Sequence, residues 1–185
     1  MTSIITVALI GAFAISGSIA EAVKAPETEF VGPSYTVSMT AYNAVPEQTD
    51  GDPRTTASGA YSNPEVVAAR SIDLKEELPF GTIIEIMNVA TSTPGCGYSV
   101  VEEHLGYRVI ADSMHPRKRN QVDILLDNDP VVKVGGKKIN PAIALGVCKN
   151  VEIRVVGTTT IKEIPNNQAA LKRVVEKQRL AMRQL

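Results

Sequence analysis

Alternation of hydrophobic and polar positions with a period of two marks several short segments in the middle of the chain. Residues 35–41 alternate in this way, and residues 82–88, 107–111, 122–126 and 149–156 are similar strand-like runs. A period of two is typical of strands that bury one face. Clusters of Gly and Pro separate the runs. The pattern therefore predicts an all-β barrel or sandwich, with one or two helical turns at residues 141–146.

The end of the chain has a different pattern. Residues 166–185 contain neither Gly nor Pro, and they carry five basic residues against one acidic residue, Glu176. We expect a basic C-terminal helix within residues 158–185 that packs one stripe on the barrel, or a frayed tail. Contact with a membrane or a partner, and helical self-association, are the alternatives. The stripe consists of Leu171, Val174, Val175, Met182 and Leu185.

The longest apolar run lies at the N-terminus. Residues 4–15 are almost entirely apolar, and small residues up to Ala20 and Ala22 follow in an A-x-A arrangement. This arrangement predicts a signal peptide at residues 1–22, cleaved after Ala22, and a linker at residues 23–34. An uncleaved membrane anchor and a buried helix are the alternatives. Cleaved or anchored, the rest of the chain would be exported to the periplasm, the cell envelope or the medium.

Composition limits the class of protein. The chain has 185 residues, 44% of them hydrophobic, and a formal net charge of −1. These values fit one globular domain and exclude global disorder. The near-neutral charge argues against a nucleic-acid-binding domain. Two Cys and two His are too few for a zinc ribbon, and the spacing of His104 and His115 indicates no metal site. No cofactor is implied.

The two cysteines gain importance if the chain is exported. A disulfide between Cys96 and Cys148 would close a loop of roughly 50 residues and add about 3–4 kcal/mol of stability. Two unpaired, buried thiols are the other interpretation. Neither cysteine has a neighbouring His in the pattern of a catalytic nucleophile.

Two aspartates stand beside strongly apolar segments. Asp112 follows residues 109–111, and Asp123 precedes residues 124–126. A carboxyl group against apolar surface has a raised pKa and can hold a proton near neutral pH. General-acid cleavage of a glycosidic bond needs such a proton. The Lys- and Arg-rich loop between them suits anionic substrate groups. However, an Asp at a strand end often only caps a turn.

A series of short blocks narrows these alternatives. Asp112 and Asp123 are 11 positions apart, and Lys118, Asn120 and Val122 lie between them. The blocks, in order, are Thr-Ala-Tyr at 40–42, Thr-Thr-Ala-Ser-Gly at 55–59, Val-Ala-Ala-Arg-Ser-Ile-Asp at 67–73, Leu-Pro-Phe-Gly-Thr at 78–82, Tyr-Arg-Val-Ile-Ala-Asp at 107–112, the segment leading to Asp123, and a closing segment at 144–153. Together with the spacing of the two aspartates, this series resembles the three-aspartate (3D) domain of cell-wall enzymes and is similar to the membrane-bound lytic transglycosylase A group.

The resemblance implies a six-stranded double-psi β-barrel at residues 35–157, with peptidoglycan glycan strands as its partner. It also implies cleavage between N-acetylmuramic acid and N-acetylglucosamine to give a 1,6-anhydro product. On this basis Asp123 is the single general acid/base, Asp112 raises or orients it, and Asp73 supports the site through hydrogen bonds. Candidates for binding the sugar are Tyr42, Thr56, Ser58, Gly59, Lys118 and Asn120.

The chain departs from the family pattern in the loop after Asp112. The family has Thr-Gly-Gly there and a later Gly, whereas this chain has residues 113–115 (Ser-Met-His) and Arg119. Because Gly permits backbone conformations that other residues rarely adopt, the loop must follow another path. The change favours an alternative, a non-catalytic or expansin-like glycan binder. A structural envelope or virion protein is a further alternative. An aspartic protease is weaker, since no hydroxyl-Gly pair follows either Asp.

Overall fold

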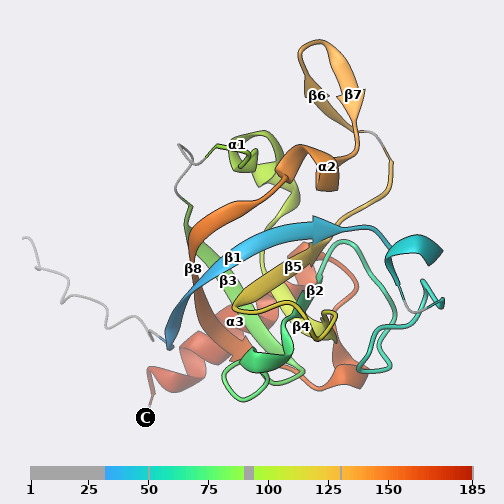
Figure 1. Ribbon diagram of the computed structural model, residues 1–185. Coiled ribbons are helices and arrows are strands. Elements are labelled where there is room, and N and C mark those ends of the chain that lie inside the picture. Colours follow the sequence, from blue (N-terminus) through green and yellow to red (C-terminus); the bar gives the residue numbers. More distant parts are fainter. Residues whose placement is uncertain (1–31, 50, 90–93, 130, 185) are drawn as a thin grey trace, which may run out of the picture.

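The computed structural model describes residues 32–49, 51–89, 94–129 and 131–184. The predicted signal peptide lies outside the described residues, as does most of the predicted linker. The described part of the chain is mostly β-structure, in which a closed six-stranded barrel is accompanied by a C-terminal helix (Figure 1). The β-rich class and the helix predicted from the sequence are therefore confirmed.

The barrel is a mixed sheet that closes on itself. Its strand order is β1-β5-β2-β4-β3-β8. The pairs β1–β5 and β2–β4 are parallel, and the other neighbouring pairs are antiparallel. The six strands are β1 (Ser34–Tyr42), β2 (Val67–Arg70), β3 (Thr82–Asn88), β4 (Arg108–Ser113), β5 (Gln121–Leu125) and β8 (Cys148–Thr158).

Both faces of the barrel wall are covered. Consecutive residues of a strand belong to different hydrophobic clusters: Ile83 and Ile84 separate in this way, as do Ile124 and Leu125. This follows from the alternation of side chains across a strand. All four residues of β2 are buried, and its first three residues are apolar in succession, so this strand shows no alternation of hydrophobic and polar positions. For that reason the hydrophobic–polar pattern did not reveal β2.

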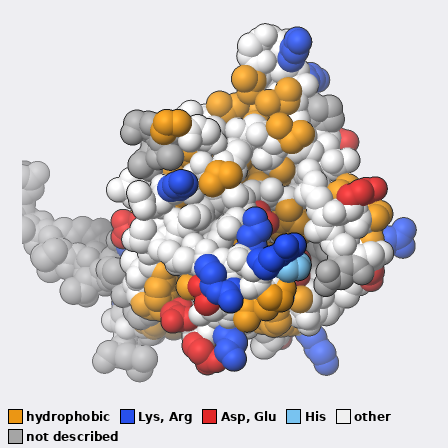
Figure 2. Space-filling view, in the orientation of Figure 1, with side chains coloured by type: hydrophobic (Ala, Val, Ile, Leu, Met, Phe, Trp, Pro, Cys, Tyr) orange, Lys and Arg blue, Asp and Glu red, His pale blue; other side chains and the backbone are white. Residues whose placement is uncertain are grey.

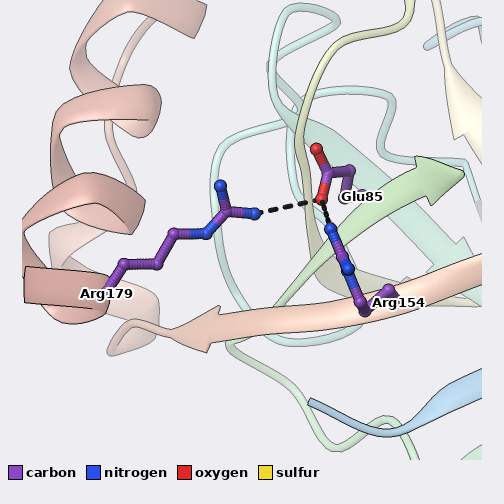
Figure 3. A network of polar contacts seen from close by, with 3 residues as sticks. All are labelled: Glu85, Arg154 and Arg179. Carbon is purple, nitrogen blue, oxygen red and sulfur yellow. Dashed lines mark hydrogen bonds and ion pairs between the residues drawn. The ribbon is translucent and has the colours of Figure 1, made fainter. Parts of the chain in front are cut away.

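Helix α3 (Gln168–Met182) packs one stripe on the barrel, as predicted. Leu171 and Val175 are fully buried. Glu85 of β3 fixes the helix further, because one of its carboxylate oxygens accepts hydrogen bonds from Arg154 of β8 at 2.9 Å and from Arg179 of α3 at 3.1 Å (Figure 3). The barrel and the helix thus form one packed unit.

Short helices and turns connect the strands of the barrel. Between β3 and β4 lie α1 (Tyr98–Val101) and a 3-10 turn, η3 (Glu102–His104). Three more such turns are η1 (Pro46–Gln48), η2 (Ile72–Leu74) and η4 (Ile161–Glu163). Helix α2 (Pro141–Leu145) occupies the predicted helical turns and follows a separate two-stranded sheet of β6 (Val132–Val134) and β7 (Lys137–Ile139).

A disulfide and a buried arginine hold the segment around α1. Cys96 and Cys148, which are 52 positions apart in sequence, are joined by a disulfide. The predicted pairing is confirmed, and the interpretation as free thiols is wrong. Arg108 is fully buried. Its guanidinium donates to the carbonyl oxygens of Leu105, Pro64, Leu125 and His104. A buried charge is tolerated only with such partners.

Candidate functional site

The register of three strands brings Asp112 and Asp123 together. Asp123 of β5 lies opposite Ala69 of β2, and Asp112 of β4 lies opposite the same Ala69 on the other side. A register shift between Ala68 and Ala69 produces this second pairing. Such a β-bulge re-aims a side chain. Because paired residues share one face of a sheet, the two carboxylates flank a small side chain.

A cleft of about 510 Å³ opens over this row. The segment after β1 borders it at Gln48 and Thr49, and the loop between β4 and β5 borders it at His115 and Pro116. Polar groups from four parts of the chain therefore meet in one open cavity. The polar and charged residues that line the cleft include Tyr42, Glu47, Thr55, Asp112, Lys118 and Asp123.

Asp123 carries a raised pKa at the wall of this cleft. Burial raises the pKa of Asp123 to about 6, although a hydrogen bond from Thr40 and the charge of Lys118 lower it, and the charge of Asp112 adds to the rise. The hydrogen bond joins Thr40 Oγ1 to Asp123 Oδ1 at 2.7 Å. Gln121 Nε2 in turn donates to Thr40 Oγ1 at 2.7 Å. Asp123 is therefore a group that gains and loses a proton near neutral pH.

Asp112 is engaged on both oxygens. The hydroxyl of Tyr42 donates to Oδ2 at 2.8 Å. The backbone N–H groups of Ala57 and Ser113 both donate to Oδ1 at 2.9 Å. Burial and the neighbouring Asp112 raise the pKa of Tyr42 far above its usual value, so the phenol stays protonated as a donor. Asp112 thus ties β1, β4 and the turn around Ala57 together.

Asp73 lies on η2 and is not among the residues that line the cleft. Its Oδ2 accepts the backbone N–H of Asn120 at 2.9 Å. Asn120 has a positive φ of 46°, which an ordinary residue rarely adopts. Partial desolvation opposes ionisation, but hydrogen bonds from Ser71 and Asn120 bring the pKa of Asp73 below its usual value. Asp73 therefore holds the end of the loop between β4 and β5. Its role in catalysis stays a prediction.

Three of the predicted sugar contacts build a turn instead of lining the cleft. Thr56 is buried, and its hydroxyl bonds to both the N–H and the carbonyl of Ala60. Ser58 Oγ lies 3.1 Å from Thr56 Oγ1, and Gly59 supplies the left-handed φ of 83° that the turn requires. Their role as sugar contacts stays a prediction. The arrangement presents the Ala57 N–H to Asp112.

Lys118 and Asn120 have separate positions in the loop between β4 and β5. Lys118 lines the cleft and lowers the pKa of Asp123. Its backbone N–H closes a turn on the carbonyl of His115 at 2.9 Å. Asn120 instead donates its amide to the carbonyl of Thr36 at 3.1 Å and fixes the end of the loop. The loop therefore brings one flexible cation to the carboxylates.

Sequence reasoning missed several groups of the site. Thr40 is the most important, because its hydroxyl holds Asp123. It lies two residues before Tyr42 on a strand, so both point to the same face, and this spacing could have identified it. The Ala57 N–H and the Thr55 side chain were also missed, although both belong to the block at residues 55–59. Backbone donors leave no signal in residue type.

A second cavity of about 520 Å³ lies elsewhere on the barrel. Glu85, Tyr98, Tyr107 and Lys172 help to line it, and it holds none of the three aspartates. Among the described residues, no group of three or more His, Cys, Asp or Glu is arranged to hold a metal ion. The aspartate cleft therefore carries the clearest acid–base chemistry in the described part of the chain.

Comparison with models of known protein families found no match, and comparison with curated proteins found none either. The geometry of the cleft is thus the basis on which a function is assigned.

Proposed function

We propose that the protein is a peptidoglycan lytic transglycosylase in which Asp123 is the single general acid/base. The observation that carries the proposal is the position of Asp123, which lies beside Asp112 at the wall of an open cleft. Burial there raises the pKa of Asp123 to about 6. A general acid works best when its pKa lies near the working pH. The hydroxyl and carboxylate groups around it suit a polyhydroxylated substrate.

The reaction needs only one titrating carboxyl. Protonated Asp123 gives its proton to the glycosidic oxygen as the bond from C1 of N-acetylmuramic acid to that oxygen breaks. The hydroxyl on C6 of the same sugar attacks C1, and the Asp123 carboxylate takes the hydroxyl proton. A 1,6-anhydro ring forms, and Asp123 returns to its protonated state. Hydrolases with two carboxylates differ, because there water ends the reaction.

Asp112 and Tyr42 act as positioning residues in this scheme. The Asp112 charge is one cause of the raised pKa of Asp123. Because the Tyr42 hydroxyl and two backbone N–H groups fix Asp112, this charge stays at a constant place beside Asp123. Asp73 positions the neighbouring loop through Asn120. Lys118 balances the charge that Asp123 carries after it has given up its proton.

We further propose that the barrel is of the double-psi type and that the chain is exported. Two parallel strand pairs, β1–β5 and β2–β4, are joined through the antiparallel pair β2–β5, and this supports the barrel type. The disulfide between Cys96 and Cys148 supports export, because such bonds persist in oxidising compartments. No described helix combines the length and the hydropathy that crossing a membrane requires.

A second candidate is an expansin-like or non-catalytic glycan-binding protein. The loop between β4 and β5 favours it, since Met114 and His115 border the cleft at the positions where the resembling family has two glycines. Such a protein would grip the glycan in the same cleft without cleaving it.

One digestion separates the two candidates. The protein is incubated with purified peptidoglycan, and the soluble products are analysed by mass spectrometry. Anhydro-muropeptides, lighter by one water than the hydrolytic products, are expected. Products heavier by one water would contradict the transglycosylase and point to hydrolysis. Co-sedimentation with the sacculus but no soluble product would favour the glycan-binding protein.

A further inference from the structure

The hairpin β6–β7 projects from the barrel (Figure 1). Val132 is buried in the same cluster as Leu145 of α2 and so fixes the base of the hairpin. At the tip, Gly135 and Gly136 have positive φ values of 57° and 82°, which a two-residue hairpin turn of this kind requires. A Cβ atom built on either glycine would meet nothing within 4 Å. The tip is therefore free of contacts with the rest of the described chain.

Positive charge is concentrated on this projection. Residues 131–149 contain four lysines and no acidic residue, whereas the whole chain has a net charge of −1. Lys133 lies directly opposite Lys138 in the hairpin register. Like charges at directly opposed positions destabilise a strand pair. An anionic surface next to the hairpin would remove this repulsion. The four lysines are Lys133, Lys137, Lys138 and Lys149.

Exposed apolar side chains surround these lysines. Ile143 on α2 is 75% exposed, and Val131, Val134 and Val147 are between 43% and 48% exposed. In Figure 2, hydrophobic side chains lie together below the Lys and Arg side chains at the projecting top of the molecule. A surface with both features is typical of binding at the boundary between lipid headgroups and acyl chains. Lysines alone would serve an anionic polymer equally well.

The C-terminal helix lacks this combination. Its apolar residues Leu171 and Val175 are buried against the barrel, so they are occupied within the protein. Leu180, at 57% exposure, is its one large hydrophobic side chain that is well exposed among the described residues. A charged helix that has no free apolar face binds a bilayer only weakly. The sequence suggested membrane contact through this helix, and the packing favours the hairpin instead.

We propose that the hairpin β6–β7, together with the adjoining helix α2, binds the surface of a bilayer that contains anionic lipids. We call this surface the lysine hairpin. Lys133, Lys137 and Lys138 contact the headgroups, and Val134 and Ile143 enter the headgroup boundary. Each lysine near such a surface adds to the affinity, and the apolar side chains supply the part that salt does not screen. The proposal is independent of the chemistry at Asp123.

The absence of Trp from the chain allows a local test. Ile143→Trp places a single indole on the lysine hairpin, and Leu180→Trp places one on α3 at a similarly exposed position. Each full-length variant is mixed with vesicles of phosphatidylcholine alone or with added phosphatidylglycerol. Ile143→Trp is expected to shift its emission to the blue only with the anionic vesicles. No shift in Ile143→Trp, or an equal shift in Leu180→Trp, would overturn the proposal.

Substitutions of the lysines complete the test. In the Ile143→Trp background, the triple change of Lys133, Lys137 and Lys138 to Gln should weaken binding by at least about tenfold. A matched triple change of Lys162, Lys172 and Lys177 to Gln removes the same charge elsewhere and should change binding less than twofold. Equal losses would contradict a specific surface. Val134→Ser should weaken vesicle binding severalfold, and unchanged affinity would contradict the entry of apolar side chains into the headgroup boundary.

Discussion

Asp112 and Asp123 lie opposite the same residue of β2, Ala69, but their surroundings differ. Asp112 accepts hydrogen bonds from the Tyr42 hydroxyl and from the N–H groups of Ala57 and Ser113. Asp123 accepts a side-chain hydrogen bond from Thr40, and burial raises its pKa to about 6. The two aspartate side chains therefore have different roles, because three hydrogen-bond donors surround Asp112 whereas, among the described residues, a single side-chain donor contacts Asp123.

The comparison shows that hydrogen-bond donors and burial act on the pKa of a carboxyl group in opposite directions. Donors that point at a carboxylate favour its ionised form, whereas burial favours the neutral form. Asp112 serves as a fixed acceptor that joins three segments, and Asp123 is left to exchange a proton with the cleft. A pKa of about 6 against the ordinary 3.8 corresponds to about 3 kcal/mol of differential interaction.

The largest expected effect is on catalysis. Asp123→Asn keeps the shape of the side chain and can still accept the Thr40 hydroxyl, but it has no proton to exchange. Release of anhydro-muropeptides should fall by about 10²–10⁴-fold, because that is the usual contribution of a general acid. The rate is measured by mass spectrometry of the soluble products.

Asp129→Asn is the matched control, since Asp129 is exposed and outside the cleft. It should retain full activity. Full activity of a folded Asp123→Asn variant would exclude Asp123 as the acid/base and would remove the functional difference between the two carboxylates.

The next effect is on stability as a function of pH. The pKa of Asp123 is higher in the folded protein than its ordinary value of 3.8, so its contribution to stability is complete below about pH 4 and is lost as the pH rises through about 6. Asn does not titrate. Between pH 4 and 7, the wild type should lose about 2–3 kcal/mol of unfolding free energy relative to Asp123→Asn. Urea unfolding at several pH values measures this difference, and parallel curves would contradict the raised pKa.

A smaller effect on activity is expected when Asp112 loses one of its hydrogen-bond donors. Tyr42→Phe removes the hydroxyl that donates to Asp112 Oδ2. A hydrogen bond to a charged group contributes about 1.5–3 kcal/mol, so the variant should unfold with that loss of free energy. Its activity should fall about tenfold without a change in product. A loss of activity as large as that of Asp123→Asn would assign Tyr42 to the chemistry itself.

The smallest effect concerns Lys118. Its charge lowers the pKa of Asp123, so Lys118→Gln should raise that pKa by a few tenths of a unit. The descending limb of the pH–rate profile, which reports loss of the proton from Asp123, should move to higher pH by the same amount. Arg117→Gln, on the same exposed loop but outside the cleft lining, is the control. A shift to lower pH would reverse the sign of the interaction.

The sequence predicted much of the fold, and its misses have physical causes. Strands β1, β3, β4, β5 and β8 each have a visible pattern of apolar residues, whereas β2 is buried at every position and has no alternation. The hairpin β6–β7 was also missed, although Gly135-Gly136 between two short apolar-containing runs is a recognised hairpin signal. Strand β2 was therefore missed because its sequence shows no alternation, and the hairpin β6–β7 was missed although its Gly-Gly turn is visible in the sequence.

The candidate site was predicted less completely. Asp112 and Asp123 were recognised by their apolar neighbours, and the structure brings them to one row. The bulge at Ala68 and Ala69 that aligns them depends on long-range pairing, which no local pattern encodes. Thr56 was expected to face the sugar, but its hydroxyl bonds within its own turn. The residue types identified the block at residues 55–59 correctly. The path of the backbone determines that Thr55, and not Thr56, lines the cleft.

The most direct test of the proposed division between the two carboxylates is an NMR titration of the aspartate side-chain carboxyl carbons, with the Asp123 resonance assigned from the Asp123→Asn variant. The account predicts that Asp123 titrates with a midpoint near pH 6. A midpoint near pH 4, the ordinary range for an aspartate, would contradict it, because Asp123 would then hold no proton at the pH where the proposed acid must act.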